Sequence, residues 1–324
     1  MKQSQKAQKL IGKFGFESYY SEIFKDEWNE LELAIQKENV YLKFQFEDFS
    51  PYFLDPASVC AALTLPLKNE QISDSSANKI LDMCAAPGGK TLVLSSNLQE
   101  NQSLFSNERS SSRKARLEKV CESSVPQKIL EKIKITCSDS ATWCRKETEA
   151  YSSILLDAPC SSERHVFSDS KYLNEWTPSR IKSLCVEQWA LISSAWRLLV
   201  PGGFLLYSTC ALSPGENDEI IARLLKKFDG VKVFSFSECK AFFEENLNSS
   251  KAVFSFPESD FEKFESQNCQ KNFLQGISSA QNFLKKIYSS SVKTSLGFHI
   301  LPHKAFGCGP IFFTLLQKTK SLNL

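Results

Sequence analysis

Two cysteines stand where the chain changes from a strand pattern to a loop pattern. Cys160 closes the stretch "YSSILLDAPC", whose apolar run ends at Asp157, and Cys210 closes "FLLYSTC" just before Pro, Gly, Glu and Asn break the pattern. Neighbouring strands of an open parallel sheet end at one edge, where such sheets bind their ligands. We therefore expect both thiols to meet in one crevice, although most cysteines are inert core residues.

Paired thiols beside an acid and a lysine suit one kind of chemistry in particular. Carbon 5 of a pyrimidine is a poor nucleophile, but a thiolate that adds to carbon 6 makes carbon 5 enamine-like and able to take a methyl group. The thiol must be partly ionised, so its ordinary pKa of about 8.5 has to fall or a base has to assist. These residues favour nucleophilic catalysis by a cysteine, and the alternative is a packed thiol at the end of a strand.

A turn of small residues joins the first predicted strand to its helix in "DMCAAPGGKT", residues 82–91. Its two glycines let a ligand lie close to the backbone, and the amino terminus of the helix offers free N–H groups to an anion. The ending "GGKT" imitates the phosphate loop G-x-x-x-x-G-K-[ST], but the first glycine of that motif would fall at Cys84. A nucleoside triphosphatase is therefore disfavoured.

Acidic residues follow three predicted strands, namely Glu108, Asp139 and Asp157. An acid after the second strand of such a sheet is placed to accept hydrogen bonds from ribose hydroxyls. Any single one of these acids is equally explained as a helix cap. Together with the glycine turn, in the correct order, they suggest a cofactor that carries a nucleoside.

Strands alternate with helices from residue 79 onward, which predicts an α/β fold with a mostly parallel sheet covered on both faces. We expect strands beginning at residue 79 and within 103–108, 132–140, 151–160 and 204–210. A long helix is predicted over 180–199, followed by a turn at Pro201-Gly202-Gly203. Two strand-like runs within 295–318 predict a terminal antiparallel hairpin.

The two remaining regions are assigned more coarsely. Residues 1–50 are expected to form a short helical segment and a candidate RNA contact, with Tyr20, Phe24, Trp28 and Leu31 at helical spacing. Asp55-Pro56 is a helix start signal. Residues 51–324 would form the main domain, in which 230–290 is interpreted as a variable surface insertion with one or two helices.

The composition is that of an ordinary globular protein. It has 42% hydrophobic and 23% charged residues, and Lys+Arg 39 against Asp+Glu 37 gives a net charge of +2, which does not by itself indicate nucleic-acid binding. The 11 cysteines have no regular spacing, which predicts free thiols in a reducing compartment, the cytoplasm. No apolar run approaches the length of a membrane span.

Three motifs in order, "DMCAAPGGKT", "DAPCSSERH" and "YSTCALSPGEN", closely resemble those of the Sun-domain RNA cytosine-5 methyltransferases, the group related to Nop2/Sun, RsmB and RsmF. The resemblance extends from about Tyr52 to the carboxyl terminus. It implies a Rossmann-like class I methyltransferase domain with a seven-stranded sheet, S-adenosyl-L-methionine as cofactor, and ribosomal or transfer RNA as substrate. The chain would be a compact member, to which a ribosomal particle or a partner protein could supply further RNA contacts.

The resemblance also implies roles for individual residues. Cys210 would be the nucleophile that bonds to carbon 6 of cytosine, and Cys160 would assist release of the methylated base. Asp157, with Lys90 nearby, would contact the cytosine ring. The residues implied to bind the cofactor are Cys84, Ala85, Ala86, Pro87, Gly88, Gly89, Lys90, Glu108 for the ribose, Arg113, Asp139 for the adenine amine, and Asp157.

Two other functions remain open from the sequence. A catalytically silent RNA-binding or ribosome assembly factor could use the same fold, although it would have no need to keep Cys210, Asp157 or the glycine turn. A DNA cytosine-5 methyltransferase would use Cys160 as its nucleophile, and the tripeptide Glu38-Asn39-Val40 is also found in such enzymes. Here the tripeptide lies far before Cys160, so we treat it as a coincidence.

Other polar residues carry weaker predictions. His165, beside Arg164, is a candidate substrate contact, and the basic stretch 109–119 is a candidate for contacts with the RNA backbone. The pair His299 and His303 with Cys308 only vaguely suggests zinc, because the spacing lacks a second cysteine pair and the proposed chemistry needs no metal. No metal site is predicted.

Overall fold

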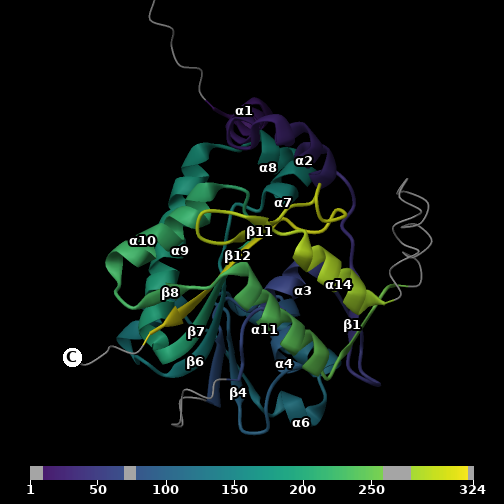
Figure 1. Ribbon diagram of the computed structural model, residues 1–324, viewed down its shortest axis with the longest axis vertical. Coiled ribbons are helices and arrows are strands. Elements are labelled where there is room, and N and C mark those ends of the chain that lie inside the picture. The colour runs from purple at the N-terminus through teal and green to yellow at the C-terminus, as the bar shows by residue number, and fades with distance from the viewer. Residues whose placement is uncertain (1–9, 69–77, 258–278, 320–324) are drawn as a thin grey trace, which may run out of the picture.

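A computed structural model describes residues 10–68, 78–257 and 279–319 of the chain. Its main sheet has nine strands in the described residues, in the order β10-β11-β12-β7-β6-β3-β4-β5, with β8 paired to β12 (Figure 1). A separate three-stranded sheet has the order β2-β1-β9.

The strands, in chain order, are β1 (Leu42–Gln45), β2 (Tyr52–Leu54), β3 (Lys79–Asp82), β4 (Ser103–Asn107), β5 (Ile133–Thr136), β6 (Tyr151–Asp157), β7 (Leu199–Thr209), β8 (Val231–Val233), β9 (Val253–Ser255), β10 (Val292–Lys293), β11 (Phe298–Ile300) and β12 (Ile311–Lys318). The α-helices are α1 (Gly12–Phe24), α2 (Trp28–Ile35), α3 (Pro56–Leu63), α4 (Gly89–Ser95), α5 (Ser111–Ser124), α6 (Gln127–Leu130), α7 (Glu163–Ser168), α8 (Ser170–Asn174), α9 (Pro178–Leu198), α10 (Asp218–Lys227), α11 (Phe236–Ser249) and α14 (Ala280–Ser289). Short 3₁₀ turns are η1 (Lys25–Glu27), η3 (Ser140–Arg145) and η4 (Pro214–Glu216).

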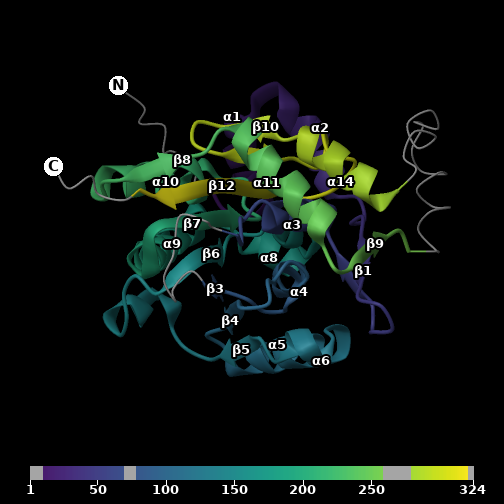
Figure 2. The same cartoon turned by 60° about the horizontal axis from the view of Figure 1, so that its bottom comes forward.

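Successive side chains of a strand point to opposite sides, and helices cover both sides of the sheet. The central strands are therefore buried on both faces. On β7, Leu206 joins a core beneath α3, α4, α11 and α14, whereas Leu205 and Tyr207 join the core beneath α9 and α10. Figure 1 shows these two groups of helices on either side of the strands, and Figure 2 shows α11 and α14 over the antiparallel part of the sheet. The predicted sheet covered on both faces is confirmed.

The parallel part of the sheet places the ligand crevice. The pairs β3–β4, β4–β5, β3–β6 and β6–β7 are all parallel. The chain moves outward from β3 through β4 to β5, then returns to place β6 on the other side of β3, so the strand order reverses between β3 and β6. Open α/β sheets bind ligands outside the carboxyl ends of the strands at such a reversal. The turn after Asp82 and the loop after Asp157 both lie there.

Two details of the predicted sheet are wrong. In the part of the chain that the structure describes, the sheet has nine strands rather than seven, because the short strands β8 and β10 add to its antiparallel part. Pro201-Gly202-Gly203 is not a turn but lies inside β7 as an irregularity, since Tyr151 pairs with Leu199 while Ser153 already pairs with Phe204.

The antiparallel strands at the carboxyl terminus agree with the sequence. β11 pairs antiparallel with β12, as the terminal hairpin predicted, and β12 pairs antiparallel with β7 along six residues, Phe204–Thr209. This second pairing fixes β12 against the strand that leads to Cys210.

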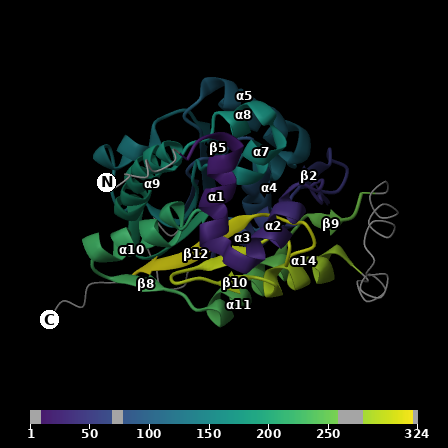
Figure 3. The same ribbon diagram turned by 90° about the horizontal axis from the view of Figure 1, so that it is seen from above.

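The amino-terminal segment is only partly helical. Its helix is interrupted at η1, where Lys25 has a φ of 50°, although Tyr20, Trp28 and Leu31 do form one buried apolar face. Residues 42–45 form β1, which pairs with β2 and with the distant β9. Figure 3, seen from above, shows α1 and α2 lying over one end of the molecule. The expectation of a helical segment over 1–50 therefore misses a strand, and its first nine residues lie outside the described residues.

The interpretation of 230–290 as a surface insertion is wrong for its described part. Phe243 of α11 and Tyr288 of α14 are fully buried, with ring centroids 4.2 Å apart in a stacked arrangement. β8 extends the main sheet, and β9 belongs to the three-stranded sheet. The region supplies one face of the core, and its residues 258–278 lie outside the described residues.

No helix in the described part of the chain is both long enough and apolar enough to cross a bilayer.

Asp55 begins α3 as the sequence predicts and also ties it to the carboxyl-terminal hairpin. Its carboxylate accepts hydrogen bonds from Ala57 N at 2.7 Å and Ser58 N at 3.4 Å, and Oδ2 accepts one from Gly309 N at 3.0 Å. We expect Asp55→Ala to lower the free energy of unfolding by about 2–3 kcal/mol, because a helix cap is lost and a buried N–H loses its acceptor. The measurement is urea denaturation followed by circular dichroism.

Ser110→Ala is the matched control, because Ser110 caps α5 through one exposed hydrogen bond of 3.4 Å to Arg113 N. It should cost only about 0.5–1 kcal/mol. Equal losses in the two variants would contradict a bridging role for Asp55.

Candidate active site

The register of β6 against β7 brings the two cysteine loops together. Asp157 lies opposite Ser208, and beyond this pair Ala158 N donates to Ser208 O at 2.9 Å. The two loops leave the strands side by side, so that Cys160 Sγ lies 2.9 Å from Cys210 Sγ, with both cysteines in the free form. Two thiols that are 50 residues apart in the chain thus form one contact pair.

Lys90 and Asp157 form an ion pair beside this thiol pair, with 2.8 Å between Nζ and Oδ2. Burial alone would lower the pKa of Lys90, but the charge of Asp157 and its hydrogen bond outweigh burial, so the pKa is raised and the ammonium is retained. Ser208 Oγ donates to Asp157 Oδ1 at 2.8 Å. The carboxylate is thereby held from two sides while a third of its side-chain surface stays exposed.

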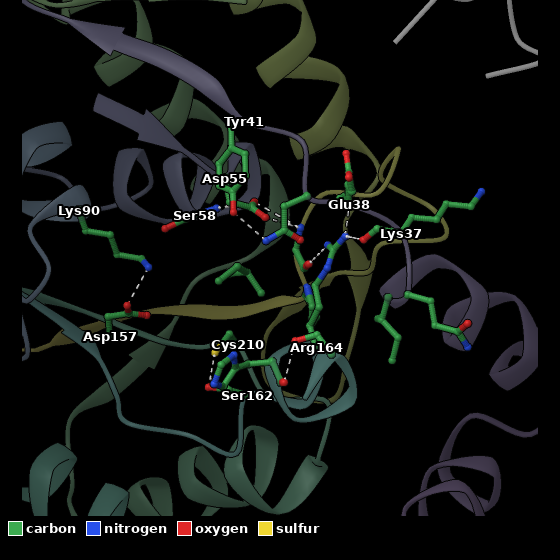
Figure 4. Close-up of a pocket in the computed structure, with 18 residues that line it drawn as sticks. Lys37, Glu38, Tyr41, Asp55, Ser58, Lys90, Asp157, Ser162, Arg164 and Cys210 are labelled. Carbon is green, nitrogen blue, oxygen red and sulfur yellow. Dashed lines mark hydrogen bonds and ion pairs between the residues drawn. The ribbon is translucent and has the colours of Figure 1, made fainter. Parts of the chain in front are cut away.

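A cavity of about 810 Å³ opens over these groups. That volume lies in the range of small-molecule and cofactor sites. Figure 4 shows Lys90, Asp157, Ser162 and Cys210 at its wall. Cys210 lines the cavity, whereas Cys160 is not among the lining residues.

The opposite wall of the cavity comes from both ends of the described chain. Residues 35–39 and Tyr41 lie there with 309–311. Arg164 holds these segments together, since its guanidinium donates to Gly307 O and Gly309 O at 2.6 Å and to Lys37 O at 2.9 Å (Figure 4). Arg164 is therefore a bracing residue. Its neighbour His165 is exposed and lines the cavity.

A second, smaller hollow of about 40 Å³ lies at the ends of β3, β4 and β5. Four residues predicted to bind the cofactor line it: Cys84, Glu108, Arg113 and Asp139. Arg109 and Glu187 also line it and form an ion pair at 2.9 Å. A whole nucleoside needs more room than this hollow provides.

Glu108 is the most enclosed acid of this hollow, being 3% exposed. Its Oε1 accepts from Ser110 N at 2.9 Å, and its Oε2 lies 3.1 Å from Arg113 but has no hydrogen-bond partner. Arg113 also donates to Ala86 O at 2.7 Å, which ties α5 to the glycine turn. Because Oε2 accepts no hydrogen bond from the described residues, Glu108 can still accept one from a ligand beside its ion pair with Arg113.

The glycine turn itself does not line either cavity between Ala85 and Gly89, although the sequence predicts that it binds the cofactor. Lys90 lines the larger cavity instead. Gly88 has a φ of 120°, a conformation that favours glycine. Asp82, at the start of the turn, received no role from the sequence, yet burial raises its pKa to about 7 and its Oδ1 has no hydrogen-bond partner among the described residues.

The pair His299 and His303 is not arranged as a metal site. Burial lowers the pKa of His299 to about 3, and His303 Nε2 lies 3.2 Å from Glu27. Across residues 10–68, 78–257 and 279–319, no group of three or more His, Cys, Asp or Glu side chains is placed to hold a metal ion.

A family model described as 16S rRNA methyltransferase RsmB/F matches residues 65–264. The chain belongs to the RsmB/F methyltransferase family. Among curated relatives it is 35% identical over 181 residues to the 5-cytosine rRNA methyltransferase NSUN4 of Xenopus laevis, covering 54% of this chain and 42% of that one. It is also 35% identical over 156 residues to the ribosomal RNA small subunit methyltransferase F of Erwinia tasmaniensis, covering 48% and 32%.

The likeness to solved structures concerns the fold. NSun6 from Pyrococcus horikoshii, crystallised with SFG, superposes with a TM-score of 0.53 at 22% identity, over 84% of this chain and 54% of that one. The chain thus spans less than half the length of the two curated relatives. The Rossmann-like methyltransferase fold implied by the sequence motifs is confirmed.

This RsmB/F member has a buried acidic pair behind the thiols that sequence reasoning missed. Glu163 and Glu216 are fully buried, and the Ser161 hydroxyl contacts both carboxylates. Tyr20 of α1 donates to Glu163, and Gln188 of α9 donates to Glu216 at 3.0 Å. Only the position of Glu216 in "SPGEN" and of Glu163 in "SSERH" hinted at it. The pair connects the amino-terminal helix to both cysteine loops.

Two adjacent buried carboxylates do not ionise together easily. Burial, and next the charge of Glu163, raise the pKa of Glu216 to about 7, against the hydrogen bonds from Ser161 and Gln188. Burial also raises the pKa of Glu163. The folded protein therefore keeps a proton on this pair at a pH where the unfolded chain has lost it.

Glu216→Gln is expected to flatten the pH dependence of stability. A folded-state pKa raised from 4.5 to about 7 means that stability present below pH 4.5 is lost as pH rises toward 7. Glutamine can keep the contacts with Ser161 and Gln188 without the charge. The urea midpoint should fall less between pH 5 and pH 7.5 in the variant than in the wild type.

Glu131→Gln is the control, because Glu131 is exposed and accepts only one hydrogen bond, at 3.3 Å from Gln127. The pH dependence of its urea midpoint should match that of the wild type. A Glu216→Gln profile as steep as that of the wild type would show that the acidic pair does not hold the proton.

Proposed function

We propose that this protein is an S-adenosyl-L-methionine-dependent RNA methyltransferase that methylates carbon 5 of a cytosine in structured RNA, either ribosomal or transfer RNA. Membership of the RsmB/F family supports the class of reaction. The observation that carries the proposal is the placement of Cys210, Lys90 and Asp157 on one cavity wall, with Cys160 in contact behind. A base must leave its stack to reach such a cavity, which favours loops and unstacked sites.

Cys210 is the nucleophile in this proposal. Its sulfur adds to carbon 6, and the electrons of the C5–C6 double bond move so that carbon 5 can take the methyl group. Asp157 and Lys90 contact the edge of the ring near N3 and N4, where charge develops. Their ion pair is only partly exposed, so it acts in a region from which much of the water is excluded.

Cys160 assists release, and its surroundings explain why it acts second. The hydrogen bond to Cys210, burial and the charge of Cys210 all raise the pKa of Cys160, so its thiol resists ionisation. Once Cys210 is bonded to carbon, the hydrogen bond and the charge are removed, and Cys160 ionises more easily. It can then lose its proton to water and accept the proton that leaves carbon 5.

The chemistry of the residues that the sequence points to supports this cofactor. Glu108 offers a buried carboxylate oxygen that is ion-paired with Arg113 but accepts no hydrogen bond from the described residues, and Asp139 lines the same hollow. Acids at such strand ends accept hydrogen bonds from ribose hydroxyls and from an adenine amine. S-adenosylmethionine supplies a methyl group on a sulfonium, and SFG, the ligand in the NSun6 structure, is one of its analogues. In this proposal Arg113, the turn 84–89 and Lys90 complete the site with Asp157.

The RNA would contact the wall formed by residues 35–39 and Tyr41, together with His165 and the basic stretch 109–119. The balanced net charge of +2 suggests a modest grip on phosphate groups, so a ribosomal particle or a partner protein is proposed to supply further contacts. The chemistry needs reduced thiols, and a reducing compartment, the cytoplasm, is therefore part of the proposal.

Trapping of a covalent adduct tests the roles of the two cysteines. Wild type, Cys210→Ala and Cys160→Ala proteins are incubated with total cellular RNA and S-adenosylmethionine, and adducts are separated on a denaturing gel. Cys160→Ala should accumulate the adduct because release is blocked, whereas Cys210→Ala should give none. Sequencing of the trapped RNA identifies the substrate.

Cys137→Ala is the matched control, since Cys137 is an exposed free thiol away from the cavity. The reverse pattern would assign the nucleophile to Cys160, as in a DNA-type mechanism. The absence of any adduct would favour the silent assembly factor.

Asp157→Asn is expected to reduce methyl transfer roughly 100-fold or more, because the ring loses its charged partner and Lys90 loses its ion pair. The rate is measured with labelled cofactor and the RNA identified by trapping. Asp229→Asn, at an exposed acid outside the cavity, should behave as the wild type. A rate for Asp157→Asn within three-fold of the wild type would contradict the role given to Asp157.

A further inference from the structure

Ser162 has a backbone conformation that its side chain does not explain. Its φ is 54° and its ψ is 58°, the left-handed region that favours glycine. It precedes the first residue of α7, where serine usually accepts a hydrogen bond from the helix backbone, yet here the side chain makes no capping bond. A residue held in this way at a site is a reason to look for a function of its side chain.

The Ser162 hydroxyl instead faces the two thiols. Its Oγ lies 3.1 Å from Cys210 Sγ and 3.6 Å from Cys160 Sγ. Another acceptor for its single proton is Cys160 O at 3.4 Å, which is longer than the contact to Cys210. Ser162 also lines the cavity with Cys210, Lys90 and Asp157 (Figure 4). The hydroxyl therefore reaches the sulfur that the proposed reaction uses, from the cavity side.

We propose that Ser162 is a catalytic residue, whose hydroxyl donates a hydrogen bond to the Cys210 thiolate before it attacks and again when it is expelled. This inference rests on the proposed function for the identity of the reaction. Hydrogen bonds to a charged sulfur favour the charged form, so the hydroxyl stabilises the thiolate relative to the neutral thiol.

In this proposal the Cys210 sulfur is charged before the attack and again after release, so the hydrogen bond from Ser162 acts at both stages. In the attack, the sulfur electron pair forms the bond to carbon 6 and the negative charge leaves the sulfur. In the release, a base takes the proton from carbon 5, the C5–C6 double bond re-forms, and the electrons of the C6–S bond return to Cys210 as a thiolate. Ser162 keeps its own proton throughout and hydrogen-bonds to the sulfur at both ends of the sequence.

Other polar and charged groups also surround the two thiols. Cys160 contacts Cys210 directly, and Lys90 is close enough for its charge to interact with Cys210. Asp157 is paired with Lys90, and Glu216 interacts with Cys160 from behind. All of these groups remain unchanged in the Ser162→Gly and Ser162→Ala proteins used for alkylation, so a change in the reactivity of Cys210 there is assigned to the hydroxyl.

The test uses the reactivity of Cys210 toward iodoacetamide, which needs neither RNA nor cofactor. The wild type, Ser162→Gly and Ser162→Ala proteins, each with all 324 residues, are alkylated from pH 6 to pH 9.5, and mass spectrometry of the peptides reads Cys210 and Cys160 separately. We expect alkylation of Cys210 at neutral pH to be roughly ten-fold slower in both variants, because a hydrogen bond to a charged group is lost. The rise in Cys210 alkylation with pH should occur at higher pH in both variants than in the wild type.

The glycine variant separates this role from a structural one. Ser162→Gly relieves the backbone conformation, so its urea midpoint should equal or exceed that of the wild type while Cys210 becomes less reactive. Asp48→Gly is the matched control, because Asp48 has a φ of 59° in an exposed turn outside the cavity. It should gain in stability in the same way and leave the reactivity of Cys210 unchanged.

Unchanged alkylation of Cys210 in Ser162→Gly and Ser162→Ala would overturn the proposal. Adduct trapping in a Cys160→Ala background then distinguishes failure of the proposed function from failure of the role given to Ser162. Slower adduct formation after Ser162→Gly supports both the function and the role of Ser162. Slower alkylation without an RNA adduct in any protein supports the hydrogen bond to the thiolate and overturns the RNA methyltransferase function.

Discussion

The parallel pairing of β6 with β7 is the constraint on which the site depends. It sets Asp157 opposite Ser208, and the Ser208 hydroxyl holds the carboxylate that in turn holds Lys90. The same pairing makes the loops after the two strands neighbours, so the thiols meet without any covalent link. The backbone hydrogen bonds between β6 and β7 thus place Asp157 and the two cysteines, and Lys90 is held through Asp157. On its other edge β7 is held in position by β12.

The cavity wall opposite the thiols is built differently, from the segment that follows α2 and the loop that leads into β12. One guanidinium, that of Arg164, donates to backbone carbonyls of both the amino-terminal segment and the carboxyl-terminal loop. Asp55 binds the same loop through Gly309 N. Charged side chains that hydrogen-bond to backbone groups give a fixed wall where regular secondary structure is absent.

The sequence was most informative where structure follows from local pattern. Apolar runs that end in an acid located the parallel strands, and the motifs around Cys160 and Cys210 located the site, because strand ends at one sheet edge converge. Pairings between distant segments left no such signal. β1 joins β9 across about 200 residues, and α11 and α14 are buried only because they cover the sheet. The contact between Glu163 and Glu216 likewise depends on three-dimensional packing, since nothing local makes two acids adjacent.

The hydrogen bond from Tyr20 to Glu163 has a consequence for how this protein can be recombined with its relatives. Tyr20 belongs to α1, whereas Glu163 is the first residue of α7, close after Cys160. An amino-terminal segment transplanted from a relative without this hydroxyl would leave a buried carboxylate short of a donor, directly behind the thiols. In a chimera, Tyr20 and Glu163 must therefore come from the same parent protein. The point at which the two parent sequences are joined has to respect this contact, and the end of the helical segment alone is not a sufficient guide.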